Sequence, residues 1–193
     1  MFEGGEACGK STQAARLAGH LGAVLTREPG GTALGERLRA VLLDPDTGDL
    51  DARTELLLML AARAEHVERV IVPALAAGRD VVCDRFSGSS VAYQAHGRGL
   101  DPDEVARLSR WASAGLEPDL TVLLEVDGAT RATRLGGDPD RLEAAGAAFH
   151  TRVDEGFRAL ASADPDRWVT LDGNRSVDEV AGAVVDAVRA HLG

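Results

Sequence analysis

Lysine and cysteine are scarce in this sequence. Only one of its 21 basic residues, Lys10, is a lysine, and all the others are arginines. The two cysteines, Cys8 and Cys83, are too few for a disulfide framework or a zinc-ligand set, which excludes small disulfide-stapled and zinc-stabilised folds. Cys83 lies in an apolar run, so we expect its thiol to be buried. Free thiols of this kind suit a reducing compartment, and we expect a cytoplasmic protein.

The sequence also lacks net positive charge and long apolar runs. Its formal net charge of −10 argues against general binding of nucleic acid, which needs a basic surface. No apolar run reaches the ~20 residues of a membrane-spanning helix, and we recognise no signal peptide. The length of 193 residues suits one domain. We therefore expect a single domain over residues 1–193 with neither nucleic acid nor membrane as a partner.

Apolar runs alternate with helical periods along the whole chain. Strands are predicted at residues 1–3, 23–26, 80–83, 120–125 and 168–171. Helices are predicted at residues 11–21, 33–43, 54–77, 89–94, 103–115, 128–135, 142–163 and 177–191. This alternation is typical of an α/β fold with a mainly parallel sheet of about five strands.

Local signals predict where several of these elements begin and end. Asp103 and Asp127 are predicted helix N-caps, Gly78 is the predicted end of the long helix, and Ser176 and Glu179 form a capping box before the last helix. The first strand is unusually short, because only Met1, Phe2 and Glu3 precede the glycines, whereas a strand usually has about 5–6 residues.

The run Gly-Gly-Glu-Ala-Cys-Gly-Lys-Ser at residues 4–11 matches the P-loop pattern G-x-x-x-x-G-K-[ST]. Its glycines allow backbone N–H groups to turn toward a phosphate, the lysine reaches the β- and γ-phosphates, and the serine hydroxyl binds Mg²⁺. The pattern predicts a three-layer α/β/α P-loop NTPase fold that binds ATP and Mg²⁺. The expected nucleotide contacts are Gly4, Gly5, Glu6, Ala7, Cys8, Gly9, Lys10, Ser11 and Thr12.

A P-loop alone leaves GTPases, motor ATPases and small-molecule kinases open. A GTPase needs an Asn-Lys-x-Asp segment to read its base, and this chain has no second lysine for it. A motor ATPase is usually larger and carries an apolar strand that ends in consecutive acidic residues, and no such strand occurs here. These exclusions favour a kinase.

Further motifs make the chain resemble the bacterial thymidylate kinases, P-loop nucleoside monophosphate kinases that transfer the ATP γ-phosphoryl group to dTMP. The resemblance covers nearly the full length. It is carried by the P-loop, by Thr-Arg-Glu-Pro-Gly-Gly-Thr at 26–32, Ala-Ala-Arg-Ala-Glu-His at 61–66, Asp-Arg-Phe at 84–86, Ser-Val-Ala-Tyr-Gln at 90–94, Gly-Arg-Gly at 97–99 and Asp-Arg-Leu-Glu at 140–143.

The resemblance implies roles on the acceptor side. Glu6 accepts a hydrogen bond from the 3′-hydroxyl of dTMP, Arg85 holds its phosphate, and Asp84 joins Ser11 in orienting Mg²⁺ or its waters. Arg63 donates to a thymine carbonyl, Ser90 contacts the base edge, and Tyr93 packs under the deoxyribose and crowds a 2′-hydroxyl. Further implied acceptor contacts are Arg27, Met59, Gln94 and Arg98.

The resemblance also implies a small lid over ATP at about residues 134–143. Because Ala7 stands where some members carry a P-loop arginine, the catalytic arginines are expected in the lid, at Arg134 and Arg141, beside Lys10 and Arg85. Met59 replaces a phenylalanine that stacks on thymine, and Phe86 stands where tyrosine is frequent. These two departures leave open a kinase of another deoxynucleoside monophosphate. The short first strand and the Ala7-Cys8 pair in the P-loop leave open a catalytically weakened nucleotide-binding homologue. The family is commonly homodimeric.

Overall fold

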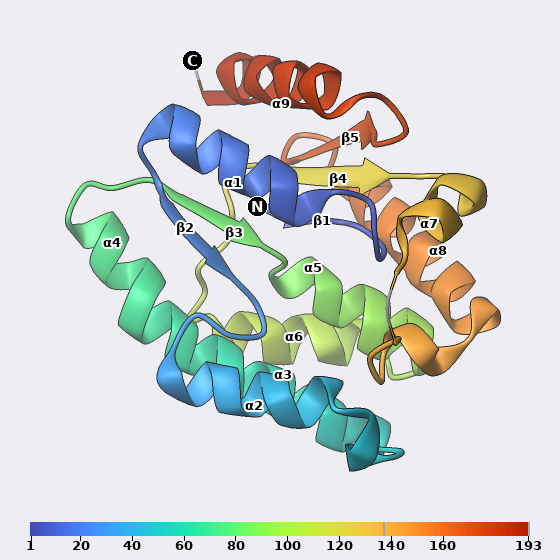
Figure 1. Ribbon diagram of the computed structural model, residues 1–193. Helices are drawn as coiled ribbons and strands as arrows, with labels where there is room; N and C mark the ends of the chain where they lie inside the picture. The colour runs from blue at the N-terminus through green and yellow to red at the C-terminus, as the bar shows by residue number, and fades with distance from the viewer. Residues whose placement is uncertain (137, 193) are drawn as a thin grey trace.

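Five parallel strands form the centre of the computed structural model, which describes residues 1–136 and 138–192 (Figure 1). The strands are β1 (Phe2–Glu3), β2 (Val24–Arg27), β3 (Val81–Asp84), β4 (Thr121–Glu125) and β5 (Trp168–Asp172). They pair in the order β2-β3-β1-β4-β5. The chain order reverses around β1, and ligands of open α/β sheets bind beside the carboxyl ends of the strands at such a point.

The central strand β1 is as short as the sequence predicts. Phe2 lies opposite Asp84 of β3 and Val122 of β4, and Glu3 lies opposite Leu123. Both residues are fully enclosed because helices cover the two faces of the sheet. The chain therefore enters the P-loop directly from the middle of the sheet.

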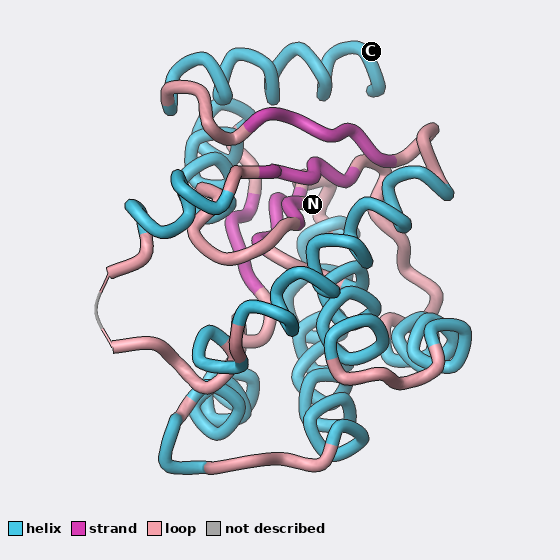
Figure 2. The backbone as a smooth tube through the Cα atoms, turned by 90° about the vertical axis from the view of Figure 1, so that its right-hand side faces the viewer, coloured by secondary structure: helices cyan, strands magenta, loops and turns pink. Residues whose placement is uncertain are grey.

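Helices cover the two faces in separate layers, as the two views at right angles show (Figures 1 and 2). On one face lie α1 (Lys10–Leu21) and α9 (Val177–Leu192), which pack against each other. The other layer holds α2 (Ala33–Leu43), α3 (Ala52–His66), α4 (Val72–Ala76), α5 (Ser87–Ser90), α6 (Pro102–Ala112) and α8 (Ala147–Ala163), and α7 (Gly128–Arg134) follows β4. Among the described residues, no helix is both long and apolar enough to cross a membrane.

The strand β4 shows how its sequence serves both layers. Val122 and Leu124 pack into the core under α1 and α9, whereas Leu123 packs with Phe157 of α8 on the opposite face. Successive side chains of a strand point to opposite faces. An uninterrupted apolar run therefore fits this strand, which is covered on both sides. Cys83 is buried as predicted.

Four predicted helices differ from the observed ones. The long helix contains a π-helical segment, Val67–Ile71, in which Val72 N donates to Val67 O, just before Pro73, which has no N–H to donate. The helix predicted from residue 103 begins at Pro102, and its N-cap is Asp101. The Asp-Pro pair at residues 101 and 102 indicates this start, because proline is favoured at the first position of a helix.

The remaining differences lie around α5 and α8. The helix predicted at residues 89–94 starts earlier, as α5, and continues as a π-helical segment, Val91–Gly97. The helix predicted from residue 142 begins only at Ala147, because Gly146 has a φ of 91° and separates it from a 3₁₀ turn, Glu143–Ala145. Asp127 and the Ser176–Glu179 box cap their helices as predicted.

Candidate active site

The P-loop joins the end of β1 to the start of α1. Gly4 and Gly9 have φ values of 139° and 95°, and a Cβ at Gly4 would lie 2.4 Å from Leu124 O. These two positions therefore require glycine. Lys10 Nζ turns back over the loop and donates to Gly5 O at 2.6 Å. The thiol of Cys8 packs into the core, so only the backbone of this residue remains for a nucleotide.

A cavity of about 400 Å³ opens above the P-loop. Six of its lining residues were predicted to bind nucleotide, and Arg27, Asp84, Arg85 and Arg134 also belong to the predicted site. The full lining is Glu6, Ala7, Gly9, Lys10, Ser11, Thr12, Arg27, Glu28, Arg39, Asp84, Arg85 and Arg134. The cavity thus holds four arginines and a lysine, a composition that suits a polyphosphate.

Ser11 and Asp84 meet in the lining of this cavity. Ser11 Oγ donates to Asp84 Oδ2 at 2.5 Å, and Asp84 Oδ1 is buried without a hydrogen-bond partner. No group of three or more His, Cys, Asp or Glu residues is arranged to hold a metal ion in the described part of the chain. One carboxylate and one hydroxyl fit Mg²⁺, which completes its shell with waters and substrate phosphates.

Arg85 links the P-loop to the residues on the acceptor side. It follows β3 directly and has a φ of 69°, a conformation that residues with a side chain rarely adopt. Its guanidinium donates to Gly4 O at 3.0 Å, to Glu6 Oε1 at 2.7 Å, to Tyr93 OH at 3.1 Å and to Ser89 Oγ at 3.1 Å. Strain at a residue so well held is typical of a functional site.

Glu6 is kept ionised by this arrangement. Burial by itself raises the pKa of its carboxyl, but the Arg85 guanidinium and the Lys10 ammonium outweigh burial and bring the pKa down to about 2. Tyr93 OH also donates to Glu6 Oε1, at 2.5 Å. Glu6 therefore presents an anionic hydrogen-bond acceptor where the P-loop meets the acceptor side.

A second, smaller cavity of about 70 Å³ adjoins the first. Glu6, Glu28, Arg39 and Arg85 line both cavities. The other residues around the smaller cavity are Pro29, Leu43, Met59, Arg63, Phe86, Ser89, Ser90, Tyr93, Gln94, Asp140 and Leu142. Predicted acceptor residues from three separate segments of the chain therefore meet at one cavity.

Arg63 is fixed at the edge of this cavity by four groups. Its Nε donates to Glu28 Oε2 at 2.8 Å, Nη1 donates to Ser90 Oγ at 3.1 Å and to Ser109 Oγ at 3.3 Å, and Nη2 donates to Phe86 O at 2.9 Å. The guanidinium also lies 5.2 Å from the centre of the Phe86 ring. A buried arginine held in this way is pre-organised to donate to a ligand.

Gln94 carries an unpaired acceptor at the same cavity. Its side chain is 0% exposed, Nε2 donates to Glu55 Oε1 at 3.0 Å, and Oε1 has no hydrogen-bond partner. A buried polar atom without a partner costs free energy unless a ligand or water completes it. Gln94 Oε1 is therefore an acceptor available to a ligand.

Arg98 and Arg141 occupy a different position from the one predicted for them. Both donate to Glu55 Oε2, at 3.0 Å and 2.6 Å, and Arg141 Nε also donates to Leu42 O. Among the described residues, neither arginine lines the two cavities. Of the two predicted lid arginines, the exposed Arg134 therefore faces the P-loop cavity, whereas Arg141 is buried in an ion cluster. Gly137 of the predicted lid lies outside the described residues.

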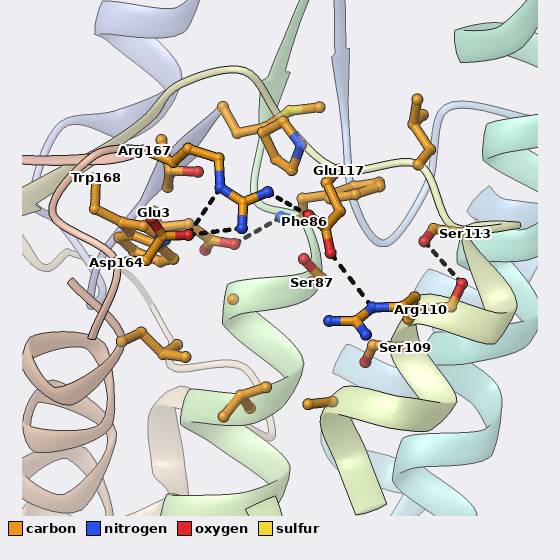
Figure 3. A pocket seen from close by; sticks show the side chains of 18 residues that line it. Glu3, Phe86, Ser87, Ser109, Arg110, Ser113, Glu117, Asp164, Arg167 and Trp168 are labelled. Atoms are coloured by element: carbon orange, nitrogen blue, oxygen red, sulfur yellow. Dashed lines mark hydrogen bonds and ion pairs between the residues drawn. The ribbon is translucent and has the colours of Figure 1, made fainter. Parts of the chain in front are cut away.

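A third cavity of about 160 Å³ lies on the far side of Phe86 (Figure 3). Glu3, which is buried, accepts hydrogen bonds there from Phe86 N and Ser89 N, both at 2.9 Å, and from Ser89 Oγ at 2.6 Å. At the mouth, Glu117 forms ion pairs with Arg110 and Arg167, as the dashed lines in Figure 3 show. Glu3 therefore holds the turn after Arg85 from behind.

The chain is similar to known proteins along nearly its whole length. A family model described as thymidylate kinase matches residues 2–184. The chain belongs to the thymidylate kinase family. The thymidylate kinase of Cutibacterium acnes is 46% identical over 197 residues, which cover 100% of this chain and 96% of that protein. The thymidylate kinase of Solidesulfovibrio magneticus is 51% identical over 197 residues, covering 95% and 94%.

A solved structure agrees with these relatives. The crystal structure of thymidylate kinase from Ehrlichia chaffeensis superposes with a TM-score of 0.81 at 32% identity, covering 97% of this chain and 96% of that one. The resemblance inferred from the motifs and the P-loop NTPase fold are both confirmed.

Sequence reasoning missed several residues at the site of this thymidylate kinase family member. Arg39 lines both cavities, Glu28 binds Arg63 and His66, and Arg131 pairs with Asp154 beside Gly5. Glu28 lies within the Arg-Glu-Pro-Gly-Gly run that carried the resemblance, which could have drawn attention to it. Arg39 and Arg131 stand on ordinary helices in an arginine-rich chain and give no local signal.

Proposed function

We propose that this chain is an ATP-dependent dTMP kinase that forms dTDP for dTTP synthesis, with residues 1–193 acting as one kinase domain. All the relatives named above are called thymidylate kinases, which favours dTMP over another deoxynucleotide and a kinase over a weakened homologue. The observation that carries the choice of base is the unpaired Gln94 Oε1 in the acceptor cavity.

Gln94 and Arg63 together match the edge of thymine. Thymine has an N–H at position 3, which donates a hydrogen bond to Gln94 Oε1. It also has a carbonyl at position 4, which accepts a hydrogen bond from Arg63. Cytosine has a lone pair at position 3, which would face the Gln94 oxygen, and an amino group at position 4, which would face the Arg63 N–H groups. Cytosine would therefore form neither hydrogen bond. Ser90, bonded to Arg63 Nη1, contacts the same edge, and Met59 packs on the face of the ring.

Arg85, Glu6 and Tyr93 hold the rest of the acceptor. Arg85 binds the dTMP phosphate with its planar guanidinium. The ionised Glu6 accepts from the 3′-hydroxyl, and Tyr93 packs against the deoxyribose and excludes a 2′-hydroxyl. Arg39, which lines both cavities, adds positive charge between acceptor and donor phosphates. Arg27 lies at the P-loop cavity and is a further phosphate contact.

Catalysis in this account is positioning and charge neutralisation. The dTMP phosphate has a second pKa near ~6, so its attacking oxygen is already ionised at neutral pH. Lys10 and the backbone N–H groups of residues 4–12 bind the ATP phosphates, and Arg134 approaches the transferring phosphoryl group from α7. Ser11 and Asp84 would hold Mg²⁺, which would supply charge neutralisation at the phosphate oxygens.

An acceptor panel tests the proposal. ADP release with Mg²⁺ and ATP is measured with dTMP, dCMP, UMP and AMP, beside Lys10→Ala and Arg85→Ala variants. We expect release to rise with dTMP alone, and both variants to lose turnover, because each lacks a charge that faces the phosphates. Equal release with every acceptor would contradict the assignment. Tight calorimetric binding of ATP and dTMP without turnover would instead favour the weakened homologue.

We also propose a homodimer in the cytoplasm. Leu57 of α3 and Trp111 of α6 are 61% and 79% exposed, and these two helices pack side by side. Contiguous exposed apolar patches mark protein interfaces, and we expect these two side chains to lie in such a patch. Light scattering should give twice the mass of one chain for the wild type and a monomer for the Leu57→Glu, Trp111→Glu double variant. A monomeric wild type at micromolar concentration would contradict the dimer.

A further inference from the structure

Glu55 is a buried carboxylate that touches the acceptor site only through another side chain. It lies on α3 and is 0% exposed. Its Oε1 accepts from Gln94 Nε2 at 3.0 Å and from Arg98 Nε at 3.2 Å. Its Oε2 accepts from Arg98 Nη2 at 3.0 Å and from Arg141 Nη2 at 2.6 Å. Among the described residues Glu55 lines neither the acceptor cavity nor the P-loop cavity.

The two arginines keep this carboxylate ionised. Burial by itself raises the pKa of Glu55, but the hydrogen bonds from Arg98, Gln94 and Arg141 outweigh it and leave the pKa below its ordinary value. An ionised carboxylate only accepts hydrogen bonds. The Gln94 amide must therefore turn its NH₂ group toward Glu55, and its oxygen, on a residue that lines the acceptor cavity, is left without a partner.

We propose that Glu55 is a specificity-positioning residue: it fixes the orientation of the Gln94 amide, so that the cavity offers an acceptor and selects pyrimidines with an N–H at position 3. This rests on the proposed contact between Gln94 and the base. An amide reads a base in two opposite ways according to its orientation, so a glutamine alone does not determine the choice. The negative charge of Glu55 determines the orientation of the Gln94 amide and therefore the base that is selected.

Glu55→Gln should reverse the amide. Oε2 of Glu55 receives two charged donors, from Arg98 and Arg141, so the single oxygen of a glutamine belongs at that position. The NH₂ group of the new side chain then takes the place of Oε1, where it faces Gln94 and gives up the weaker bond from Arg98 Nε. Gln94 turns its own oxygen toward that group and presents NH₂ to the cavity.

The test uses two acceptors that differ only at positions 2 and 3 of the ring. One is dTMP, and the other is 5-methyl-2′-deoxyisocytidine 5′-monophosphate, which keeps the 5-methyl group and the 4-carbonyl but has a lone pair at N3 and an amino group at C2. The ratio of their kcat/KM values is measured for the wild type, Glu55→Gln and Gln94→Leu. Glu3→Gln is the matched control, because it also neutralises a buried carboxylate but does not bond to Gln94.

We expect Glu55→Gln to lower the preference for dTMP by about tenfold, the effect of one hydrogen bond gained or lost. Glu3→Gln should leave the preference unchanged, whatever it does to total activity. An unchanged preference in Glu55→Gln, together with a lost preference in Gln94→Leu, would overturn the role of Glu55. An unchanged preference in Gln94→Leu would instead overturn the proposed base contact itself.

A measurement on the wild type covers the case in which Glu55→Gln does not fold. Hydrogen exchange of the Gln94 side-chain amide is followed by NMR, with and without dTMP. Slow exchange in the free enzyme is expected, because the Gln94 side chain is buried and its NH₂ group donates to Glu55. Exchange as fast as that of an exposed amide, slowed only by dTMP, would show that the NH₂ group faces the cavity and would overturn the proposal.

Discussion

The two cavities that meet at Arg85 differ in size and in the state of their polar groups. The P-loop cavity holds about 400 Å³, and side chains such as Arg134 and Ser11 reach it from the exposed surface. The acceptor cavity holds about 70 Å³, and Arg63, Ser90 and Gln94 at its wall are buried and already bonded to other side chains. We therefore expect donor binding to depend on charge and backbone, and acceptor selection to depend on the orientation of buried groups.

This contrast predicts that substitutions of the buried groups behind the acceptor cavity damage stability, whereas substitutions of exposed side chains at the P-loop cavity damage turnover with little loss of stability. The largest effect on stability is expected for Glu55→Ala. It leaves Arg98 and the buried Arg141 without their carboxylate, and breaking a buried ion pair costs about 3–5 kcal/mol. Denaturant unfolding measures this loss. A loss of unfolding free energy below about 1 kcal/mol, which is typical of exposed pairs, would contradict the proposed difference between the two cavities.

The next largest effect is the pH dependence of stability that arises from Glu6. The pKa of Glu6 is about 2 in the folded chain and 4.5 in the reference state, so its contribution to stability is complete above that reference value and disappears as the pH falls toward 2. The shift corresponds to about 3 kcal/mol. Unfolding curves between pH 6 and 2 should therefore be steeper in pH for the wild type than for Glu6→Gln. Parallel pH profiles would show that Arg85 and Lys10 do not stabilise this carboxylate.

A smaller effect on stability, with a large one on turnover, is expected at Arg134. This side chain is exposed and lines the P-loop cavity, so Arg134→Ala should change the unfolding free energy by no more than about 0.5 kcal/mol. Loss of a charge that stabilises the transferring group should lower kcat by about 10²-fold. Arg37→Ala, an exposed arginine on α2, is the control. Equal kcat values for the two variants would exclude Arg134 from catalysis.

The same contrast explains what the sequence could reveal. The P-loop lies within eight consecutive positions, and Ser11 with Asp84 follows from strands that end at one edge of a parallel sheet, so the donor side was readable from local patterns. The Gln94 orientation depends on Glu55, 39 residues away, and Glu55 depends on Arg141, 86 residues away. Such long-range pairing leaves no periodic signal, and both Arg98 and Arg141 were accordingly assigned direct contacts with substrates.

The helices likewise show that features set by neighbouring residues can be predicted from the sequence, whereas other features cannot. Asp127 and the Ser176–Glu179 box were identified because a cap needs only neighbouring residues. The π-helical segment at Val91–Gly97 carries Tyr93 and Gln94 toward the acceptor cavity, and its i→i+5 bonding has no compositional signature.

Calorimetric titration of Arg85→Ala and of the wild type, with dTMP and with ATP separately, tests the division into two cavities most directly. We expect the variant to lose at least about tenfold in dTMP affinity, since a charge-assisted contact to phosphate is removed, while its ATP affinity stays within about twofold. A loss confined to ATP, or equal losses for both nucleotides, would contradict the assignment of Arg85 to the acceptor phosphate.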